Sequence, residues 1–539
     1  MKFTAFDTEN APDGTLTLCV FFDGIDYIVF DYKDYNNQLN FKDAIINHIY
    51  NISGNFLFAH NLEYDLINIF YPFNLEMLTL FYKSKLLYAR LKNSRKKFLD
   101  SFNFSFSSLK EIGKNIGIEK IETDDYYDID YCKRDTEIVY RYMENFINQY
   151  KKEFSLKLKS TLAGCSQQVF LQRFISKKIT GKNIDPVLLQ GYYGGRCEIF
   201  TYGRIEKIAA LDINSSYPFS MLNKKYPVSE HYKTKYPQEE YYMSHVRVSC
   251  NDNIKYPILP MREERLLFPG GEFETWVSSE ELKEAERRGH IKDIEYIETY
   301  NFDNAAYIFK EFIKYFYDKR ETAKNDKNKF LSQFYKLIMN STYGRFGLKG
   351  NLTSIENEME SIVEIKNTNA INFALPLFVT AYSRIALYEA IIKIADKTEV
   401  IYVDTDSIYF SYKNKNHLKS ILEDFKIDNA IGNFSYEEFN YGIFLNCKQY
   451  LTVTDEMEKY TIKGVPKDNR PEFFHTGKTK FKTPVKYRES LKSVQGLIPN
   501  LWIEKEKRNI NEYKKRIIID YDKKPFYKKY DTEALKLRI

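Results

Sequence analysis

Two aspartates interrupt the most β-prone stretch of this sequence. In the segment EVIYVDTDSIYFSY (399–412), apolar and aromatic residues flank Asp404, Thr405 and Asp406. Two such runs around a short polar turn predict a β-hairpin with both carboxylates at its tip. Aspartate is common in turns, so a purely structural turn is the alternative. The sequence therefore predicts a sheet whose hairpin carries an acidic tip.

A second strand and one helix favour a functional interpretation of that tip. The strand in RIEKIAALDI (204–213) ends at Asp212, before a turn-rich stretch with Pro218. Carboxylates that converge at strand ends bind hard divalent cations, and a pair of such ions can stabilise an in-line phosphoryl transfer. The segment KNKFLSQFYKLIMNSTYGRFG (327–347) predicts a helix ended by Gly344, with Lys336, Asn340 and Tyr343 on one polar stripe.

The N-terminal third contains a further set of acidic residues. MKFTAFDTEN (1–10) predicts a strand on which Asp7 and Glu9 face the same side. NFLFAHNLEYD (55–65) predicts a strand, a turn at Asn61 and a helix that carries Asp65. In the predicted helix of DIDYCKRDTEIV (128–139), Tyr131 and Asp135 are four residues apart and therefore neighbours.

Composition excludes several other classes of protein. With 539 residues, 43% hydrophobic and 29% charged, the chain is long enough for several globular domains. No apolar run reaches the length of a membrane span, and we expect neither a secretion signal nor a membrane segment. The six cysteines form no CxxC pair, which fits a reducing cytosol. From Phe444 onward there are 23 basic and 13 acidic residues, so Lys478, Lys480 and Lys482 are candidates for contacts with a phosphate backbone.

Eight short motifs resemble those of a known family. LDINSSYP (211–218), KLIMNSTYG (336–344) and YVDTDS (402–407) resemble motifs A, B and C of family B DNA polymerases. FDTE (6–9), HNLEYD (60–65) and YCKRD (131–135) resemble the motifs of their 3′–5′ exonuclease. YYGG (192–195) and KQY (448–450) resemble the YxGG and KxY motifs of the protein-primed branch of phages, adenoviruses and linear plasmids.

The resemblance implies a role for each matching polymerase residue. Asp212, Asp404, Asp406 and the Ile213 carbonyl would bind two ions of Mg²⁺ or Mn²⁺, and Tyr217 would exclude ribonucleotides. Lys336, Asn340 and Tyr343 would bind the incoming nucleotide, with either Arg320 or Lys324 as a second phosphate ligand. The residues that would contact DNA are Tyr192, Gly194, Gly195, Lys448, Tyr450 and Lys463.

The resemblance implies a parallel set of exonuclease residues. Asp7, Glu9, Asp65 and Asp135 would bind two metal ions, and Tyr131 would orient the attacking water. Asn61, Tyr64 and Ser101 would hold single-stranded DNA, and Lys120 is a candidate for the catalytic lysine. Ser216 and Asn10 depart from the family pattern, where Leu and Thr are common.

The implied fold is a multidomain α+β protein, with an RNase H-like exonuclease followed by a right-hand polymerase and two insertions. The expected parts are the exonuclease (1–155), linker and first palm part (156–222), insertion 1 (223–305), fingers (306–346), insertion 2 as a β-hairpin (347–375), second palm part (376–475) and thumb (476–539). In the family, the two insertions contact a terminal protein and wrap the template, for processivity and strand displacement.

The implied activity is templated DNA synthesis from dNTPs with proofreading, started on the hydroxyl of a terminal protein. The expected partners are template and primer DNA, dNTPs and the terminal protein, with the chain a monomer or a 1:1 heterodimer in a host cytoplasm. Three alternatives remain: a family B polymerase that extends ordinary primers, an inactive DNA-binding relative, and a stand-alone nuclease. The seven carboxylates argue against the inactive form, and motifs A to C argue against the nuclease.

Overall fold

The computed structural model describes most of the chain. The described residues are 1–70, 77–82, 85–175, 179, 183–251, 253–348, 352–356, 359–363, 371–484, 502–508, 516–517 and 532–533. Most of the predicted thumb (476–539), from residue 485 onward, lies outside these residues. Parts of insertion 2 and the basic segment DYDKKPFYKKY (520–530) lie outside them as well.

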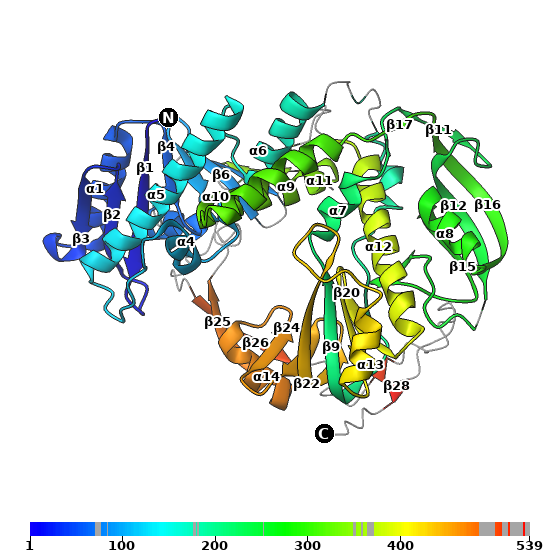
Figure 1. Ribbon diagram of the computed structural model, residues 1–539. Coiled ribbons are helices and arrows are strands. Elements are labelled where there is room, and N and C mark those ends of the chain that lie inside the picture. The colour runs from blue at the N-terminus through cyan, green and yellow to red at the C-terminus, as the bar shows by residue number, and fades with distance from the viewer. Residues whose placement is uncertain are drawn as a thin grey trace.

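The N-terminal part is a mixed sheet covered by helices on both faces (Figure 1). Its strands are β1 (Phe3–Asn10), β2 (Leu16–Phe22), β3 (Tyr27–Asp31), β4 (Phe56–Ala59), β5 (Met77–Tyr82), β6 (Lys85–Leu91) and β7 (Lys97–Asp100). Its helices are α1 (Gln38–Asn51), α2 (Leu62–Phe70), α3 (Phe102–Ser105), α4 (Leu109–Ile116) and α5 (Ile129–Phe154). Strand β4 runs parallel to β1 and β7.

Alternation along β1 decides which helix each side chain meets. Phe3 and Ala5 share a core with α5, whereas Phe6 shares a core with α1 and α2. Because successive side chains of a strand point to opposite faces, Asp7 and Glu9 face the side of α5.

The palm is a seven-stranded antiparallel sheet in the order β24-β23-β22-β9-β21-β20-β8. Its strands are β8 (Cys197–Ile199), β9 (Gly203–Ile213), β20 (Val400–Asp404), β21 (Ser407–Ser411), β22 (Phe434–Asn446), β23 (Gln449–Val453) and β24 (Glu458–Ile462). The helices beside it are α7 (Ser216–Leu222), α12 (Ala374–Ala395) and α13 (Lys415–Leu422), whereas α6 (Leu162–Val169) packs against the helices at 329–340 and 342–346. The predicted hairpin is present as β20 and β21, with Asp404 paired to Ser407.

Helix α12 is the one described helix long and apolar enough to cross a bilayer by length and composition. Of its most apolar window, 78% is buried inside the protein. It also holds Arg384, which is buried and ion-paired at 2.8 Å with Glu281 of α8 (Ser279–Arg287). These features are those of a core helix.

The predicted fingers consist of helices α9 (Lys310–Asn325), α10 (Lys329–Asn340) and α11 (Thr342–Phe346), which connect the N-terminal part of the molecule to the palm (Figure 1). Two local predictions are wrong here and in α7. The helix ends at Asn340 rather than Gly344, which lies inside α11. Pro218, predicted to lie in a turn-rich stretch, lies instead in the first turn of α7, where proline is tolerated because it lacks only an N–H that this turn leaves unpaired.

Both predicted insertions contain β structure. Within residues 223–305, β11 (His231–Thr234), β16 (Ile291–Phe302), β12 (Tyr241–Cys250) and β15 (Glu272–Ser278) form one sheet with α8 beside it. Two-residue strands pair as β10 (Tyr226–Pro227) with β17 (Ala305–Ala306) and β13 (Met261–Arg262) with β14 (Leu266–Leu267). In insertion 2, β18 (Leu352–Glu356) and β19 (Met359–Val363) form the predicted hairpin, and β18 pairs with β5, so the hairpin extends the exonuclease sheet.

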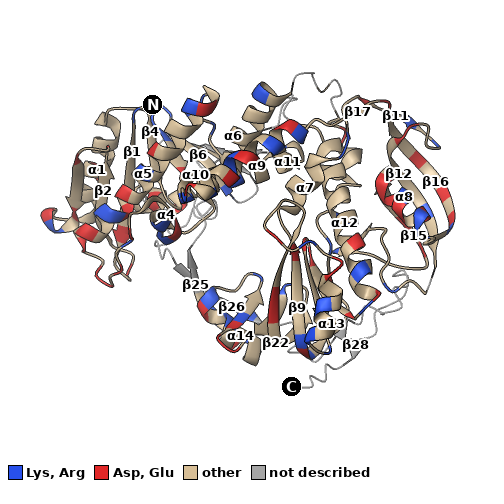
Figure 2. Cartoon of the chain, in the orientation of Figure 1, with Lys and Arg blue, Asp and Glu red and all other residues tan. Residues whose placement is uncertain are grey.

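The described C-terminal elements are short. They are α14 (Arg470–Thr476), β25 (Lys478–Pro484), β26 (Trp502–Arg508), β27 (Arg516–Ile517) and β28 (Thr532–Glu533). Figure 2 shows acidic and basic residues interspersed over all parts of the molecule.

Candidate functional site

Three aspartates meet at one edge of the palm sheet. Asp212 pairs with Ser407 across β9 and β21, so it lies next to the turn that carries Asp404 and Asp406. The Ile213 N–H donates to the Asp406 carbonyl over 2.9 Å. The convergence expected from the sequence is therefore present, because antiparallel pairing brings residues about 200 positions apart into register.

The end of the YxGG segment (192–195) and the residue after it contact this turn. Thr405, between the two aspartates, has a φ of 64°. Its N–H donates to the Arg196 carbonyl over 2.7 Å. A Cβ added to Gly195 would lie 2.8 Å from Thr405 Cγ2, closer than such atoms approach in proteins. Glycine at 195 thus allows the backbone to reach the acidic turn, while Gly194 is exposed.

The palm carboxylates repel one another. Burial, with the negative charges of Asp212 and Asp404, raises the pKa of Asp406 to about 7. Burial and the charge of Glu437 raise the pKa of Asp212. Lys448 places its Nζ 2.7 and 2.8 Å from the two oxygens of Asp404. A cation is therefore already paired with this group of acids.

The residues next to the palm acids include two tyrosine rings. The rings of Tyr217 and Tyr343 lie 4.7 Å apart at 36°. The pKa of Tyr343 is raised by burial and by the neighbouring Tyr217 and Tyr192. Ser216, the departure from the family pattern, is buried and exchanges a 2.9 Å hydrogen bond with Ser383 of α12. A polar contact therefore takes the place of apolar packing beneath this pair of rings.

Three cations gather on the fingers. The pKa of Lys336 is lowered by loss of water around its amine and by the charges of Arg320 and Lys324. Lys324 is paired with Glu321 at 2.7 Å. By contrast, the buried Nε of Arg320 has no hydrogen-bond partner among the described residues. Asn340 is exposed at the end of α10, the helix that also carries Lys336.

The KQY segment contributes differently from its three positions. Lys448 has a φ of 57° and reaches Asp404, as above. Tyr450 is 7% exposed and its hydroxyl lies 3.2 Å from that of Tyr409. The Lys463 N–H donates to the Lys448 carbonyl over 3.1 Å, which sets this lysine beside the KQY turn. Contacts of these residues with DNA stay predictions.

Four carboxylates form the second acidic cluster. Asp7 and Glu9 project from β1, Asp65 from α2 and Asp135 from α5. Burial, then Glu9, Asp65 and Asp135, raise the pKa of Asp7 well above its usual value. Burial and Asp135 raise the pKa of Glu9 to about 7. The structure thus brings together the four residues predicted from three separate motifs.

Lys120 lies at the edge of this cluster. Its Nζ forms an ion pair with Asp135 and lies 2.9 Å from the Tyr131 hydroxyl. The sequence spacing alone did not place this lysine. The structure sets it within reach of both residues of the YCKRD motif.

Polar neighbours that sequence reasoning missed hold Asp65 in place. Thr8 donates to Asp65 Oδ1 over 2.7 Å and accepts from the Asn68 amide over 3.0 Å. Thr8 lies between Asp7 and Glu9 in sequence. Alternation along the strand therefore predicts that its side chain lies on the opposite face of β1, and this was the sequence feature that could have identified it. Asp100 accepts from the Asn61 N–H over 3.0 Å, and burial raises its pKa to about 6.

The residues predicted to hold single-stranded DNA differ in exposure. Asn61 is exposed in a left-handed turn with a φ of 64°. Tyr64 is half-buried and donates to Asn10 over 3.4 Å. Ser101 is fully buried, 2.9 Å from His60 Nδ1. Tyr192, near Tyr343, is half-buried.

The donor atoms of both clusters fit hard divalent cations, which prefer carboxylate oxygens. Asp65 Oδ2 and Asp135 Oδ1 are buried without a hydrogen-bond partner among the described residues. Ligand atoms of Asp7, Glu9 and Cys132 lie within 4.8 Å of one another. Such unpaired buried oxygens are costly unless a cation or proton joins them.

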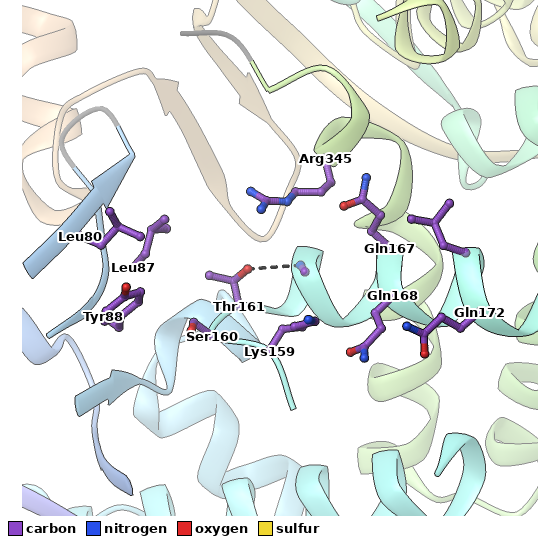
Figure 3. Close-up of a pocket in the computed structure, with 12 residues that line it drawn as sticks. Leu80, Leu87, Tyr88, Lys159, Ser160, Thr161, Gln167, Gln168, Gln172 and Arg345 are labelled. Carbon is purple, nitrogen blue, oxygen red and sulfur yellow. Dashed lines mark hydrogen bonds between the residues drawn. The ribbon is translucent and has the colours of Figure 1, made fainter. Parts of the chain in front are cut away.

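A pocket of about 450 Å³ opens between the exonuclease sheet, α6 and the fingers. Figure 3 shows Arg345 of α11 on one side, Tyr88 of β6 on another and Lys159 below. Its other labelled lining residues are Leu80, Leu87, Ser160, Thr161, Gln167, Gln168 and Gln172. Sequence reasoning did not indicate this pocket, because its walls come from three distant segments.

Comparisons with known proteins agree with this geometry. A DNA polymerase of Enterobacteria phage PRD1 is 29% identical over 305 residues, which cover 52% of each chain. The DNA polymerase of Bacillus phage phi29 is 24% identical over 379 residues, 63% of this chain and 62% of that one. A probable DNA polymerase of Podospora anserina is 25% identical over 413 residues, 63% of this chain and 32% of that one. The chain thus spans about half or less of the length of the first curated relatives it matches.

Solved structures show the same fold. The phi29 DNA polymerase complexed with primer-template DNA superposes with a TM-score of 0.74 at 18% identity, over 94% of this chain and 100% of that one. This likeness confirms the multidomain α+β fold predicted from the motifs. The family model for DNA polymerase type B, organellar and viral, matches residues 121–421, more than half of the chain. The protein therefore belongs to the type B DNA polymerases of organelles and viruses.

Proposed function

We propose that this protein adds deoxynucleotides to a 3′-OH on a DNA template and releases pyrophosphate. The observation that carries the proposal is the meeting of Asp212, Asp404 and Asp406 at the palm edge. It is supported by the matches to phage and fungal proteins named DNA polymerase.

Divalent metal dependence is general in this family, and here Asp212, Asp404 and the Ile213 carbonyl would hold two ions of Mg²⁺ or Mn²⁺, with Asp406 beside them. The bound metal would neutralise charge on the attacking and leaving oxygens. Lys336 and Arg320 would bind the triphosphate; the unpaired Nε favours Arg320 over Lys324, which is held by Glu321. Tyr217 and Tyr343, ring against ring, would form the wall that packs on the sugar and base.

The N-terminal cluster would remove mismatched 3′ ends. Asp7, Glu9, Asp65 and Asp135 would hold the metal ions, and the Tyr131 hydroxyl would orient water. Lys120 would keep that hydroxyl and Asp135 in place through its two contacts. Pairing energy alone discriminates poorly between bases, so a second hydrolytic site improves accuracy.

The pocket between exonuclease and fingers suits a single DNA strand. Arg345 and Lys159 supply positive charge for phosphates, and Tyr88 supplies a ring for a base. Its position beside α11 and the extended exonuclease sheet supports a path for template DNA between the two parts.

The proposed start of synthesis is a hydroxyl of a terminal protein, with ordinary nucleic-acid primers as the alternative. The separate sheet of insertion 1 and the hairpin of insertion 2 support this proposal, since each adds a surface to the polymerase. The proposed working form is a monomer or a 1:1 heterodimer with the terminal protein, in a host cytoplasm.

Two assays test these proposals separately. Extension of a primed template in Mg²⁺ should yield full-length product, and its absence with folded protein would refute polymerase activity. Attachment of dNMP to the protein encoded beside this gene, without any primer, should occur if synthesis is protein-primed. Extension without such attachment would favour ordinary primers.

A further inference from the structure

Two half-buried thiols lie close to Asp404, one of the palm acids. Cys197 begins β8, where it is paired with Asp404 of β20. Cys447 lies in the turn between β22 and β23 and directly precedes Lys448. The two cysteines are 250 positions apart in the sequence, and β8 lies at one edge of the sheet, yet the turn between β22 and β23 places Cys447 against Cys197.

Direct contacts connect the two residues. Cys447 Sγ lies 3.4 Å from the Cys197 carbonyl, and Cys197 Sγ lies 3.3 Å from the Tyr402 hydroxyl. The neighbouring thiol is the largest influence on each pKa, lowering that of Cys197 and raising that of Cys447. Cys19, Cys132, Cys165 and Cys250 are all buried, so these two thiols are the more accessible ones.

We propose that Cys197 and Cys447 are a reversible oxidation site that switches DNA synthesis off. A low-molecular-weight disulfide such as oxidised glutathione is the oxidant. One protein thiol attacks it and releases one small thiol; the second protein thiol then displaces the other. The sum is two protein thiols plus one small disulfide giving one protein disulfide plus two small thiols, which carry the two protons and two electrons.

The consequence for synthesis follows from Lys448 and rests on the proposed function. A covalent sulfur–sulfur bond is about 2.0 Å long, shorter than a contact between two thiols, so the turn must move toward β8. The Lys448 N–H donates to the Tyr402 hydroxyl over 3.1 Å, and its Nζ holds Asp404. Movement of the turn displaces the lysine that pairs with a palm acid, far from the exonuclease cluster.

The test treats the full-length protein with mixtures of oxidised and reduced glutathione. Peptide mass spectrometry without reductant identifies any Cys197–Cys447 bridge, while primer extension and single-strand degradation are measured on the same samples. We expect the bridged fraction to lose synthesis about 100-fold, the scale of a 1 Å misplacement at a reacting centre. Degradation should stay unchanged, and dithiothreitol should restore synthesis.

Matched variants separate the pair from general oxidation. Cys447→Ser and Cys197→Ala should each keep synthesis after oxidation, whereas Cys250→Ser should be as sensitive as the natural chain. Glutathione adducts without the bridge, or a bridged protein that synthesises normally relative to its reduced form, would overturn the proposal. Mass spectrometry detects the bridge independently of DNA synthesis. If the reduced protein never synthesises DNA, the proposed function is refuted, and the mass spectra still show whether the bridge forms.

Discussion

In the proposed exonuclease cluster the acids come from one strand and two helices, whereas in the palm they come from β9 and from the hairpin of β20 and β21 in one sheet. Of the exonuclease acids, Asp65 and Asp135 are buried and each has one oxygen without a hydrogen-bond partner among the described residues, whereas Asp7 and Glu9 are half-buried. The palm acids are half-buried, and Lys448 already balances Asp404. One cluster is fixed by packing and side-chain hydrogen bonds; the other is fixed by strand register.

This difference sets what each site tolerates. Register is secured by many backbone hydrogen bonds along β9 and β21, so one altered side chain leaves the palm geometry intact. The exonuclease geometry depends on individual contacts such as Thr8 with Asp65. Substitutions in the palm should therefore affect chemistry more than stability, whereas those in the exonuclease should affect both.

The largest effect is expected from Asp404→Ala. Because Asp404 is at the centre of the palm acids, synthesis should fall about 1,000-fold or more, the upper range for one electrostatic group in an active site. Primer extension measures the loss, and degradation of single strands on the same preparation is the control. Synthesis at a normal rate would remove Asp404 from the proposed metal site.

Asp7→Ala should produce the opposite pattern. Degradation of 3′ ends should fall about 100-fold, somewhat less than in the palm because three carboxylates of the cluster remain. Extension of a matched primer should be unaffected. If 3′ ends were still trimmed at the natural rate, the exonuclease assignment would fail.

The contrast also explains which features the sequence predicted. Alternation along β1 was readable from the residues, so the shared face of Asp7 and Glu9 followed from it, whereas the sequence placed Asp212 only at the end of a strand. Lys120 was left open because the fold of the loop before α5, rather than spacing, brings it to Asp135. Tyr450 matched a motif, but the core of the palm sheet buries its side chain. The signal at Gly344 failed because α10 ends at Asn340 and Gly344 lies inside α11, and the signal at Pro218 failed because proline is tolerated in the first turn of a helix.

The pH dependence of the folded protein's stability offers a third comparison of the two clusters. A carboxyl whose pKa is higher in the folded protein binds more protons when folded, so stability falls as pH rises through that interval. For Glu9 and Asp406 the interval runs from their ordinary values of 4.5 and 3.8 to about 7. Without divalent cations, Tm should drop by several degrees across it, and Mg²⁺ should reduce the drop.

Two variants divide this effect between the sites. Asp65→Asn should flatten the pH dependence of Tm more than Asp212→Asn, because Asp65 is 1% exposed and Asp212 is half-buried. Scanning calorimetry with a chelator measures both. An equal change in the two variants would show that burial does not distinguish the clusters.

The smallest effect is expected outside both clusters, on the basic strand β25. Lys478 and Lys480 are exposed, and the register places Lys480 opposite Glu506 and Lys482 opposite Glu504. Replacing all three lysines by glutamine should lower the salt slope of DNA binding, but by less than the value of about 2.7 that three phosphate contacts would give, because the register sets a glutamate opposite two of the lysines. Binding titrations at several salt concentrations measure the slope, with Lys415, Lys419 and Lys426 replaced together as an exposed control set. A slope equal to that of the natural chain would assign β25 to plain surface and leave DNA contacts to Lys448 and the fingers.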